Sequence, residues 1–303
     1  MKKSIYILIL ILAFISLPAV LYAQSDIRNS RPKGWNGRYK PSKELVADSA
    51  RYKITYQSYF SRDSVFLDDK KSGFTLTLIG ENVVQFIDSY DLEASLLGDK
   101  LYATTTLSSN EIYERKSPLF SKRIFKERIL IDYPVKGKIT YQEYLAGAFR
   151  RYLDETATQN WVIGEETKEV LGYRCRKATC RFRGRDYVAW YAEELPIPYG
   201  PYYFRGLPGL IVELCDINKE YVFNMVGFER LTNFIPMKFY DGKGVEMLSR
   251  DDFRYLKQYY NENAAAAVFN NASGIKSNLT PEQEKELEKR LNRPRPYNPL
   301  EKE

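Results

Sequence analysis

The stretch Phe204-Arg205-Gly206-Leu207-Pro208-Gly209-Leu210-Ile211-Val212-Glu213-Leu214 decides the fold expected of this 303-residue chain. Within it, Leu207-Pro208-Gly209-Leu210 is typical of a type II turn, because Pro fixes the first central φ and Gly supplies the positive second φ. After the turn, Leu210, Val212 and Leu214 share one face of an extended segment. We therefore expect a tight turn that leads into a buried strand.

Two predicted hairpins adjoin this turn. The downstream hairpin joins residues 210–215 to residues 221–228. In the upstream hairpin, a two-residue loop around Gly184-Arg185 would place Phe182 opposite Tyr187 and Cys180 opposite Ala189. Further strands are expected where Tyr, Phe and β-branched residues alternate with polar ones, as on a half-buried pleated surface. The expected strands cover residues 52–60, 74–79, 82–87, 101–105, 123–131, 174–182, 187–192, 210–215 and 221–228.

Helical patterns are expected mainly near the C-terminus. Residues 250–268 have helical spacing, and Thr280-Pro281-Glu282-Gln283 is a capping box that predicts a helix over 281–291. The segment 141–153 fits either a helix or strands. We predict an α+β fold of mainly antiparallel β structure, a curved sheet or half-barrel of hairpins with one or two C-terminal helices.

Composition divides the chain into four parts. Residues 1–23 are typical of a secretory signal peptide, because Lys2 and Lys3 precede a short apolar run and Ala23 offers a cleavage point. We expect a protein exported to the periplasm or outer cell envelope, with no transmembrane segment after signal cleavage. The other expected parts are a flexible polar leader (24–48), a single β-rich domain (51–270), and a surface helix with a Pro-rich tail (271–303).

Charge and histidine content narrow the kinds of site. The formal net charge is +7, with acidic and basic residues interspersed, so we expect no nucleic-acid partner. The sequence contains no histidine, which excludes Ser-His-Asp and Cys-His pairs and imidazole-based zinc sites. We expect no metal and no cofactor, and we assign no catalytic residue.

An aromatic loop before the turn is the candidate ligand site. Such rings either cover the core of the sheet or line a site for a lipid, peptide or glycan ligand. The candidate ligand-binding residues are Trp190, Tyr199, Tyr202, Tyr203 and Phe204.

Glu213 is the most unusual acidic residue, because it interrupts an otherwise apolar strand. One interpretation is a structural ion pair with an arginine such as Arg174 or Arg176. The other is a carboxylate that faces a second acid in a cleft, as a hydrolase requires.

Three cysteines leave at least one thiol without an intramolecular partner. Cys175 and Cys180 lie on one expected strand, where five residues span about 16 Å, too far for a disulfide. A bond from either of them to Cys215 stays open, as does burial of the thiols as small hydrophobic groups.

Taken together, these motifs resemble the GLPGLI family of exported bacterial proteins. The resemblance implies export in bacteria with an outer membrane, and it implies no catalytic residue, because the family has no established activity. Cys175 stands at the family's usual cysteine position, so the resemblance favours a disulfide between Cys180 and Cys215. The residues that carry it are Gly172-Tyr173-Arg174-Cys175-Arg176-Lys177-Ala178, Gly184-Arg185, Ala189-Trp190-Tyr191, Pro196, Gly200-Pro201, Gly206-Leu207-Pro208-Gly209-Leu210-Ile211 and Pro296-Tyr297-Asn298-Pro299-Leu300-Glu301.

Three functional hypotheses follow from these features. The first, which we favour, is a non-enzymatic envelope protein that binds an apolar or amphipathic ligand in a cavity of the sheet lined by Tyr, Phe and Leu. The second is an interaction module that docks on an outer-membrane or surface protein complex through an exposed aromatic patch at residues 199–204. The third is a carboxylate-dependent hydrolase in which Glu213 faces another acid.

Overall fold

The computed structural model describes residues 43–64, 67–145, 148–155, 159–262, 280–291 and 297–302. The chain divides into two compact units. The sheet unit comprises Tyr39–Gln258 and Arg295–Glu303, and the second unit comprises Met1–Arg38 and Tyr259–Pro294. The predicted signal peptide and the predicted leader up to residue 42 therefore lie outside the described residues.

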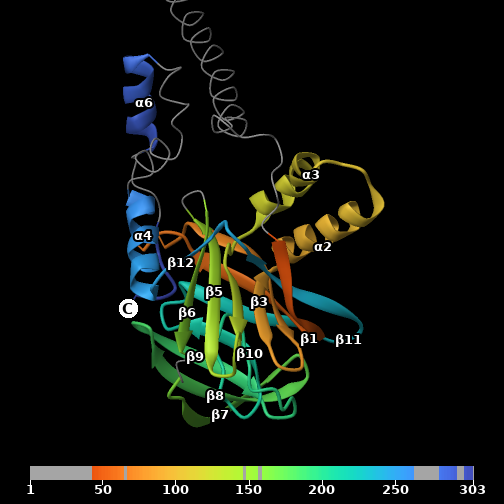
Figure 1. The fold of residues 1–303 in the computed structure, drawn as a ribbon. Coiled ribbons are helices and arrows are strands. Elements are labelled where there is room, and N and C mark those ends of the chain that lie inside the picture. Colours follow the sequence, from red (N-terminus) through yellow and green to blue (C-terminus); the bar gives the residue numbers. More distant parts are fainter. Residues whose placement is uncertain are drawn as a thin grey trace, which may run out of the picture. The chain divides into compact units, whose positions relative to one another are not determined.

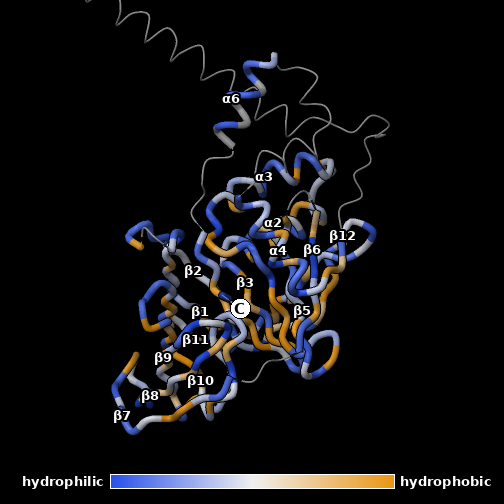
Figure 2. The backbone as a smooth tube through the Cα atoms, turned by 90° about the vertical axis from the view of Figure 1, so that its left-hand side faces the viewer, coloured by the Kyte–Doolittle hydropathy of each residue, from blue (hydrophilic) through white to orange (hydrophobic). Residues whose placement is uncertain are grey.

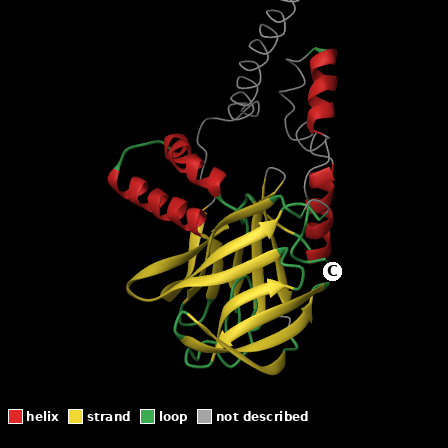
Figure 3. Cartoon of the chain, turned by 180° about the vertical axis from the view of Figure 1, so that it is seen from behind, coloured by secondary structure: helices red, strands yellow, loops and turns green. Residues whose placement is uncertain are grey.

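Twelve strands of the sheet unit form one sheet, which is open and curved (Figure 3). Their order across the sheet is β12-β6-β5-β4-β3-β2-β1-β11-β10-β9-β8-β7, and the pairs are antiparallel apart from β12 with β6 (Figure 1). This confirms the predicted α+β class with a mainly antiparallel, curved sheet. The strands are β1 Lys43–Ser61, β2 Lys70–Ile79, β3 Val84–Asp88, β4 Arg128–Ile131, β5 Lys138–Leu145, β6 Ala148–Glu155, β7 Val162–Val170, β8 Tyr173–Phe182, β9 Arg185–Ala192, β10 Leu210–Asp216, β11 Tyr221–Asp241 and β12 Val245–Met247.

Two long strands in the middle of the sheet give it its curvature. β1 pairs with β11 from Lys43 opposite Asp241 to Phe60 opposite Tyr221, and the register shifts at three places along the pair. Each shift inserts an irregularity that bends a strand and increases its twist. The two long strands therefore turn one continuous sheet into a curved surface.

One face of the sheet is packed against helix α2 (Ser89–Thr104). Leu92 of this helix joins Leu76, Leu78, Leu130 and Phe239 in a buried apolar cluster. Asp88 caps the start of the helix, because its carboxylate accepts a hydrogen bond from the Tyr90 backbone N–H at 2.9 Å. Hydrophobic residues accordingly gather along the central strands, whereas α3 (Ser109–Lys122) is mostly hydrophilic (Figure 2).

The opposite face is covered by the loop between β9 and β10. Thr77, which alternates with Leu76 and Leu78 along β2, donates a hydrogen bond to the Gly200 carbonyl at 2.9 Å. On β3, Phe86 lies next to Ile87 of the apolar cluster but packs edge-on against Tyr202, with ring centroids 5.6 Å apart. Because neighbouring residues of a strand face opposite ways, the aromatic loop lies on the face away from α2.

Helices replace part of the predicted β structure in the middle of the chain. Residues 101–105 were expected to form a strand, but they lie at the end of α2. The strand expected over 123–131 is limited to β4, and the ambiguous segment 141–153 contributes to the hairpin of β5 and β6. Asp88 is an N-cap followed by buried residues at helical spacing, so the start of α2 is marked in the sequence.

The hairpin of β8 and β9 has a different register from the one expected. Its two-residue loop is Arg183-Gly184, with φ values of 48° and 75°, as in the turns that suit twisted hairpins. Cys180 therefore pairs with Tyr187, and Phe182 pairs with Arg185. The predicted pairs of Phe182 with Tyr187 and Cys180 with Ala189 are wrong by two residues.

Gly209 is required for a reason other than the predicted type II turn. Its φ is not positive, whereas Gly206 has a φ of 96°. A Cβ atom on Gly209 would collide with the carbonyl oxygen of Ala192, on the neighbouring strand β9. The glycine therefore allows the backbone of the motif to approach the sheet closely.

The predicted disulfide between Cys180 and Cys215 is absent, and all three cysteines are free thiols. Cys180 lies on β8 and Cys215 on β10, with β9 between them. Two strand spacings amount to about 10 Å, which exceeds the reach of a disulfide. Cys175 and Cys180 are buried as small hydrophobic groups.

The domain boundaries also differ from those expected. Strand β1 begins at Lys43, inside the predicted leader, and residues 297–302 of the predicted tail belong to the sheet unit. The two C-terminal helices are α4 (Arg250–Glu262) and α6 (Pro281–Leu291); residues 263–268 lie outside the described part. Thr280 and Gln283 exchange the expected capping hydrogen bonds. Within the described ranges, no helix combines the length and apolar character that a membrane span requires.

Candidate ligand cleft

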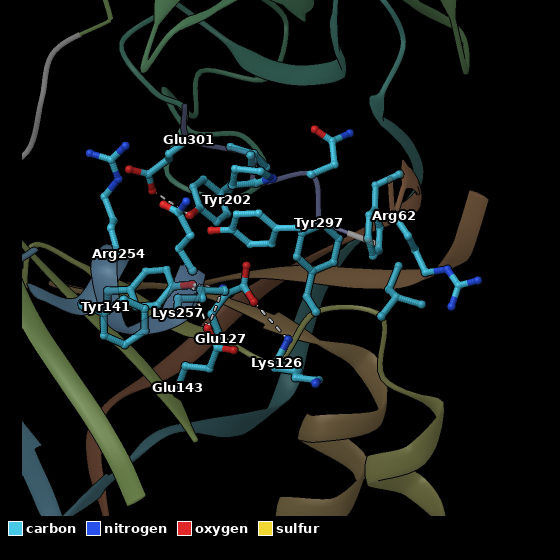
Figure 4. A pocket seen from close by; sticks show the side chains of 18 of the residues that line it. Arg62, Lys126, Glu127, Tyr141, Glu143, Tyr202, Arg254, Lys257, Tyr297 and Glu301 are labelled. Carbon is cyan, nitrogen blue, oxygen red and sulfur yellow. Dashed lines mark hydrogen bonds and ion pairs between the residues drawn. The ribbon is translucent and has the colours of Figure 1, made fainter. Parts of the chain in front are cut away.

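A cleft of about 950 Å³ lies in the sheet unit, on the face that carries the aromatic loop (Figure 4). Its lining comes from strands β1, β2, β5, β6 and β11, helices α3 and α4, the segment that enters β4, the β9–β10 loop and the C-terminal residues 297–302. Segments far apart in the sequence therefore build one site. The side chains discussed below all belong to the sheet unit.

Aromatic rings form the walls of the cleft. Tyr141 stacks on Tyr152 with ring centroids 4.8 Å apart, and Phe253 of α4 packs edge-on against Tyr141 at 5.2 Å. Phe60 stacks on Tyr221 at 5.6 Å on another side. Packing holds these rings in place: Tyr141, Tyr152, Phe253 and Tyr221 are buried, and Phe60 is the partly exposed ring among them.

The tyrosine hydroxyl groups are used within the protein. Tyr202 donates a hydrogen bond to Glu301 at 2.8 Å, and Tyr141 donates to Glu143 at 3.2 Å. Burial raises the pKa of both tyrosines well above the usual range. They therefore stay neutral phenols whose hydroxyl groups are held by partners within the protein.

Two glutamates and a lysine form the polar floor of the cleft. The register of β4 and β5 pairs Arg128 with Gln142, and Glu127 and Glu143 are the residues next to this pair along the chain. Lys257 of α4 lies 2.7 Å from Glu143. Figure 4 shows the three side chains together in the centre of the cleft. Glu127 and Glu143 are 8% and 4% exposed, so both carboxyl groups are held away from bulk water.

The two carboxyl groups have different partners. Glu143 accepts hydrogen bonds from the Lys257 ammonium at 2.7 Å and from the Tyr141 hydroxyl at 3.2 Å. Glu127 accepts a hydrogen bond from the backbone N–H of Lys126 at 3.0 Å and forms no ion pair with any described residue. Burial raises the pKa of Glu127, Lys257 opposes this increase and Glu143 adds to it. The Glu143 carboxylate is thus paired with Lys257, whereas Glu127 holds its proton to a higher pH than an exposed glutamate does.

The C-terminal residues 297–302 form a further wall and are anchored by Arg185. The Arg185 guanidinium donates to the carbonyl oxygens of Pro299 at 2.7 Å and Leu300 at 3.1 Å, and to the side chain of Asn298 at 2.5 Å. It also pairs with Glu220 at 2.6 Å and Asp216 at 3.3 Å. Two separate parts of the sequence resemblance, Gly184-Arg185 and the C-terminal motif, therefore contact each other.

The predicted aromatic site residues have separate environments. Tyr202 lines the cleft. Tyr203 and Phe204 are 3% and 0% exposed and pack with Phe182 in the core. Tyr199 donates a hydrogen bond to Asp132 at 3.2 Å.

Trp190 lies elsewhere on β9, with the Lys168 ammonium over its ring at 4.5 Å. It does not line the cleft. The exposed aromatic patch expected of an interaction module is therefore wrong, because three of the four rings at residues 199–204 are buried.

Glu213 does not provide the acid pair that was expected of a hydrolase. Its carboxylate pairs with Lys168 of β7, and not with Arg174 or Arg176. The side chain is 28% exposed and lies outside the lining of the cleft. The structural ion pair is therefore the correct interpretation, with a different basic partner.

The sequence did not identify the floor of the cleft. Glu127 lies in a segment whose strand was placed too early, and Glu143 lies in the segment that fitted either helix or strands. Lys257 stands on the expected helix, but no local pattern connects it with residue 143. The alternation of Tyr141 and Glu143 was the available signal, and it indicates only that both residues share one face of a strand.

Comparison with known proteins finds a family model that resembles a short segment of the chain. Residues 183–213 match a family model described as "Protein of unknown function (Porph_ging)". This segment runs from the β8–β9 turn to β10 and contains Arg185, Tyr202 and the motif Gly206 to Ile211. Comparison with curated proteins gives no match.

Among solved structures, the chain is similar to PNGF-II in the P21 and C2 crystal forms. Both matches have 15% sequence identity and a TM-score of 0.46, and both cover 71% of this chain and 34% of the other. The chain thus spans about a third of the length of these structures.

Proposed function

We propose that this protein binds an amphipathic ligand in the cleft of its sheet unit, as a non-enzymatic component of the bacterial cell envelope. The supporting observation is a cleft of about 950 Å³ in which aromatic walls surround the polar group of Glu127, Glu143 and Lys257. The volume lies near the upper end of the range for small-molecule sites, which are mostly apolar and contain a few convergent polar groups.

The chemistry of the lining supports a ligand with two kinds of surface. The buried rings of Tyr141, Tyr152 and Phe253 and the partly exposed ring of Phe60 make the walls apolar, and the floor offers both hydrogen-bond acceptors and a donor. Burying a carboxyl group such as Glu127 without an ion pair reduces stability, so a purely structural core would gain from an apolar residue there. A ligand that hydrogen-bonds to Glu127 would explain why a carboxyl group is buried at this position.

The cellular location is part of the same proposal. Residues 1–23 have the charged start, apolar run and small residue of a signal peptide, which supports export. The ligand would then be a molecule of the periplasm or outer envelope, where amphipathic compounds occur. A partner protein in the outer membrane is the alternative, but the aromatic patch that it required is buried.

Binding in the cleft is testable with a fluorescent amphiphile, 8-anilinonaphthalene-1-sulfonate. Ser121 is an exposed residue that lines the cleft, so Ser121→Trp places a bulky ring in the cleft without disturbing the core. We expect one probe molecule per wild-type protein and an affinity about tenfold lower for Ser121→Trp. Asn110→Trp, an exposed change on the same helix α3 but outside the lining, is the matched control and should bind as the wild type does. Equal affinity of all three proteins would contradict the assignment.

The acid pair favours a second candidate, a carboxylate-dependent hydrolase. Glu127, which directly precedes β4, and Glu143 of β5 both line the cleft, and burial raises the pKa of Glu127. A carboxyl group with a raised pKa near a second carboxyl group is an arrangement that hydrolases use for acid catalysis. In that case Glu127 would donate a proton to a leaving group, and Glu143 would act as the base or nucleophile.

Mass analysis of bound molecules separates this candidate from simple binding. Wild-type protein, Glu127→Gln and Glu143→Gln would be purified from the periplasm of the natural host. If the protein is a hydrolase, the variants should retain a larger, uncleaved molecule than the wild type does. The same bound molecule in all three proteins would exclude hydrolysis at this pair and leave the binding function.

A further inference from the structure

The outer part of the cleft carries basic side chains from three different elements. Lys71 lies on β2, Lys126 precedes β4 and Arg254 lies on α4, and all three line the cleft. Lys71 and Lys126 are exposed, and Arg254 is partly exposed. None of the three forms an ion pair with another residue in the described part of the chain.

Most other charges of the lining are already balanced. Arg62 pairs with Asp69 at 2.5 Å, and Arg123 pairs with Asp91 at 3.0 Å. Glu301 is balanced by Arg250 at 2.6 Å. The exposed Asp251 opposes only part of the charge of the three basic side chains, so the mouth of the cleft has a surplus of positive charge.

The floor adds little charge of its own. Lys257 balances Glu143 at 2.7 Å, which leaves Glu127 as the one further carboxyl group of the floor. Among the described residues, the cleft therefore has three unpaired basic side chains outside an aromatic interior whose floor holds one ion pair and one carboxyl group. Figure 4 shows Arg254 and Lys126 on different sides of the Glu127, Glu143 and Lys257 group.

We propose that the ligand is an anionic amphiphile, whose acidic head binds among Lys71, Lys126 and Arg254 while its apolar part lies against the aromatic walls. This inference rests on the proposed binding function and names the chemical class of the ligand. Charge-assisted hydrogen bonds to a phosphate or carboxylate are stronger than neutral ones, and an arginine can contact such a group with two N–H donors. Positive charge at the mouth also accelerates the arrival of an anion.

A matched pair of lipids tests the inference. 1-Oleoyl-lysophosphatidic acid and 1-oleoylglycerol share one acyl chain and differ by the phosphate, and oleate provides a carboxylate head. Displacement of the fluorescent probe, below the concentrations at which the lipids aggregate, gives each dissociation constant. We expect the phosphate and carboxylate lipids to bind at least about tenfold more tightly than the neutral lipid, with the difference decreasing at high salt.

Two double variants test which basic side chains cause the preference for anionic lipids. The double variant Lys126→Gln/Arg254→Gln should weaken binding of the anionic lipids about tenfold and leave 1-oleoylglycerol unchanged. The control double variant Lys100→Gln/Lys136→Gln removes two exposed charges outside the cleft and should behave as the wild type does.

The possible outcomes separate the inference from the proposed function. Equal binding of neutral and anionic lipids, or an equal effect of both double variants, would overturn the inference and leave amphiphile binding intact. Failure of all three lipids to bind would overturn both. A preference for the phosphate lipid over oleate, or the reverse, would support the inference and identify the acidic head.

Discussion

Single residues in this protein show why one residue type is required at a given position. Gly209 approaches β9 so closely that the carbonyl oxygen of Ala192 occupies the place of a Cβ atom. Arg185 supplies hydrogen bonds to three C-terminal residues and two ion pairs from one buried guanidinium. Glu127 keeps a carboxyl group in an aromatic cleft. In each case the three-dimensional surroundings, and not a local turn or helix, determine the residue.

Replacing Gly209 with Ala should destabilise the sheet unit by about 1–3 kcal/mol, because backbone atoms of β9 would have to move. Gly244→Ala is the matched control, since a Cβ there meets no atom within 4 Å and its φ is not positive. Urea denaturation of both variants measures the effect. A midpoint for Gly209→Ala equal to that of Gly244→Ala would show that the close approach does not exist.

Glu127 should make stability depend on pH. Burial raises the pKa of its carboxyl group in the folded state, with Lys257 acting against this increase and Glu143 adding to it. The folded state therefore holds the proton of Glu127 more tightly than the unfolded state does. The stability that this proton contributes is lost as the pH rises from the ordinary carboxyl range through the raised pKa of the folded state. Glu127→Gln, which does not ionise, should gain stability relative to the wild type between pH 4 and pH 8, by about 1.4 kcal/mol for each unit of pKa difference.

Urea denaturation at a series of pH values checks this expectation. Glu114→Gln, an exposed change on α3, provides the reference and should keep a nearly constant difference from the wild type. A stability difference between Glu127→Gln and the wild type that does not vary with pH would mean that the carboxyl group titrates alike in the folded and unfolded states.

At the scale of elements, the sequence predicts most strands of the hairpins, but it predicts their register and the segments between them only in part. Alternation of apolar residues located β2, β3, β8, β9 and β10, and the capping box at Thr280 marked the start of α6. The register of β8 and β9 was missed because Arg183 adopts a positive φ of 48°, which a non-glycine residue rarely does. Residues 101–105 look like a strand locally, yet the packing of α2 determines their conformation.

The candidate site was harder to predict than the fold. Tyr202 was identified because it stands beside a recognisable motif. Glu127, Glu143 and Lys257 meet only because β4 pairs with β5 and α4 packs against the same face, and such long-range pairing leaves no local pattern. The resemblance to a family with no established activity supplied the motif and its C-terminal ending, but it gave no indication of the acid pair.

Arg185 should hold the C-terminal residues 297–302 to the sheet unit. Arg185→Lys keeps the charge but loses the guanidinium fork, and Asn298→Ala removes hydrogen bonds to Arg185 and to the Ser61 carbonyl. Each change should destabilise the protein by about 1–3 kcal/mol. In a double-mutant cycle the two should be coupled by about 1 kcal/mol or more, because they share contacts.

The control cycle combines Asn298→Ala with Arg181→Lys. Arg181 is exposed and pairs with Asp186 on the same hairpin, so its effect should be within about 1 kcal/mol and additive with that of Asn298→Ala. Additive effects of Arg185→Lys and Asn298→Ala would mean that Arg185 does not hold the C-terminal residues.

At the scale of the whole sheet unit, one curved sheet supplies both a closed core and an open site. The face toward α2 is filled by apolar residues, while the other face is divided between the aromatic loop and the cleft. The long strands β1 and β11 join the hairpins on either side, and residues 297–302 complete the wall of the cleft. The central claim is that this cleft holds an amphipathic ligand.

Native mass spectrometry of the protein purified from its natural host tests this claim most directly. The account predicts a stoichiometric, extractable amphipathic molecule that carries an acidic group and is lost in Ser121→Trp but retained in Asn110→Trp. An empty wild-type protein, or a bound molecule retained equally by both variants, would contradict it.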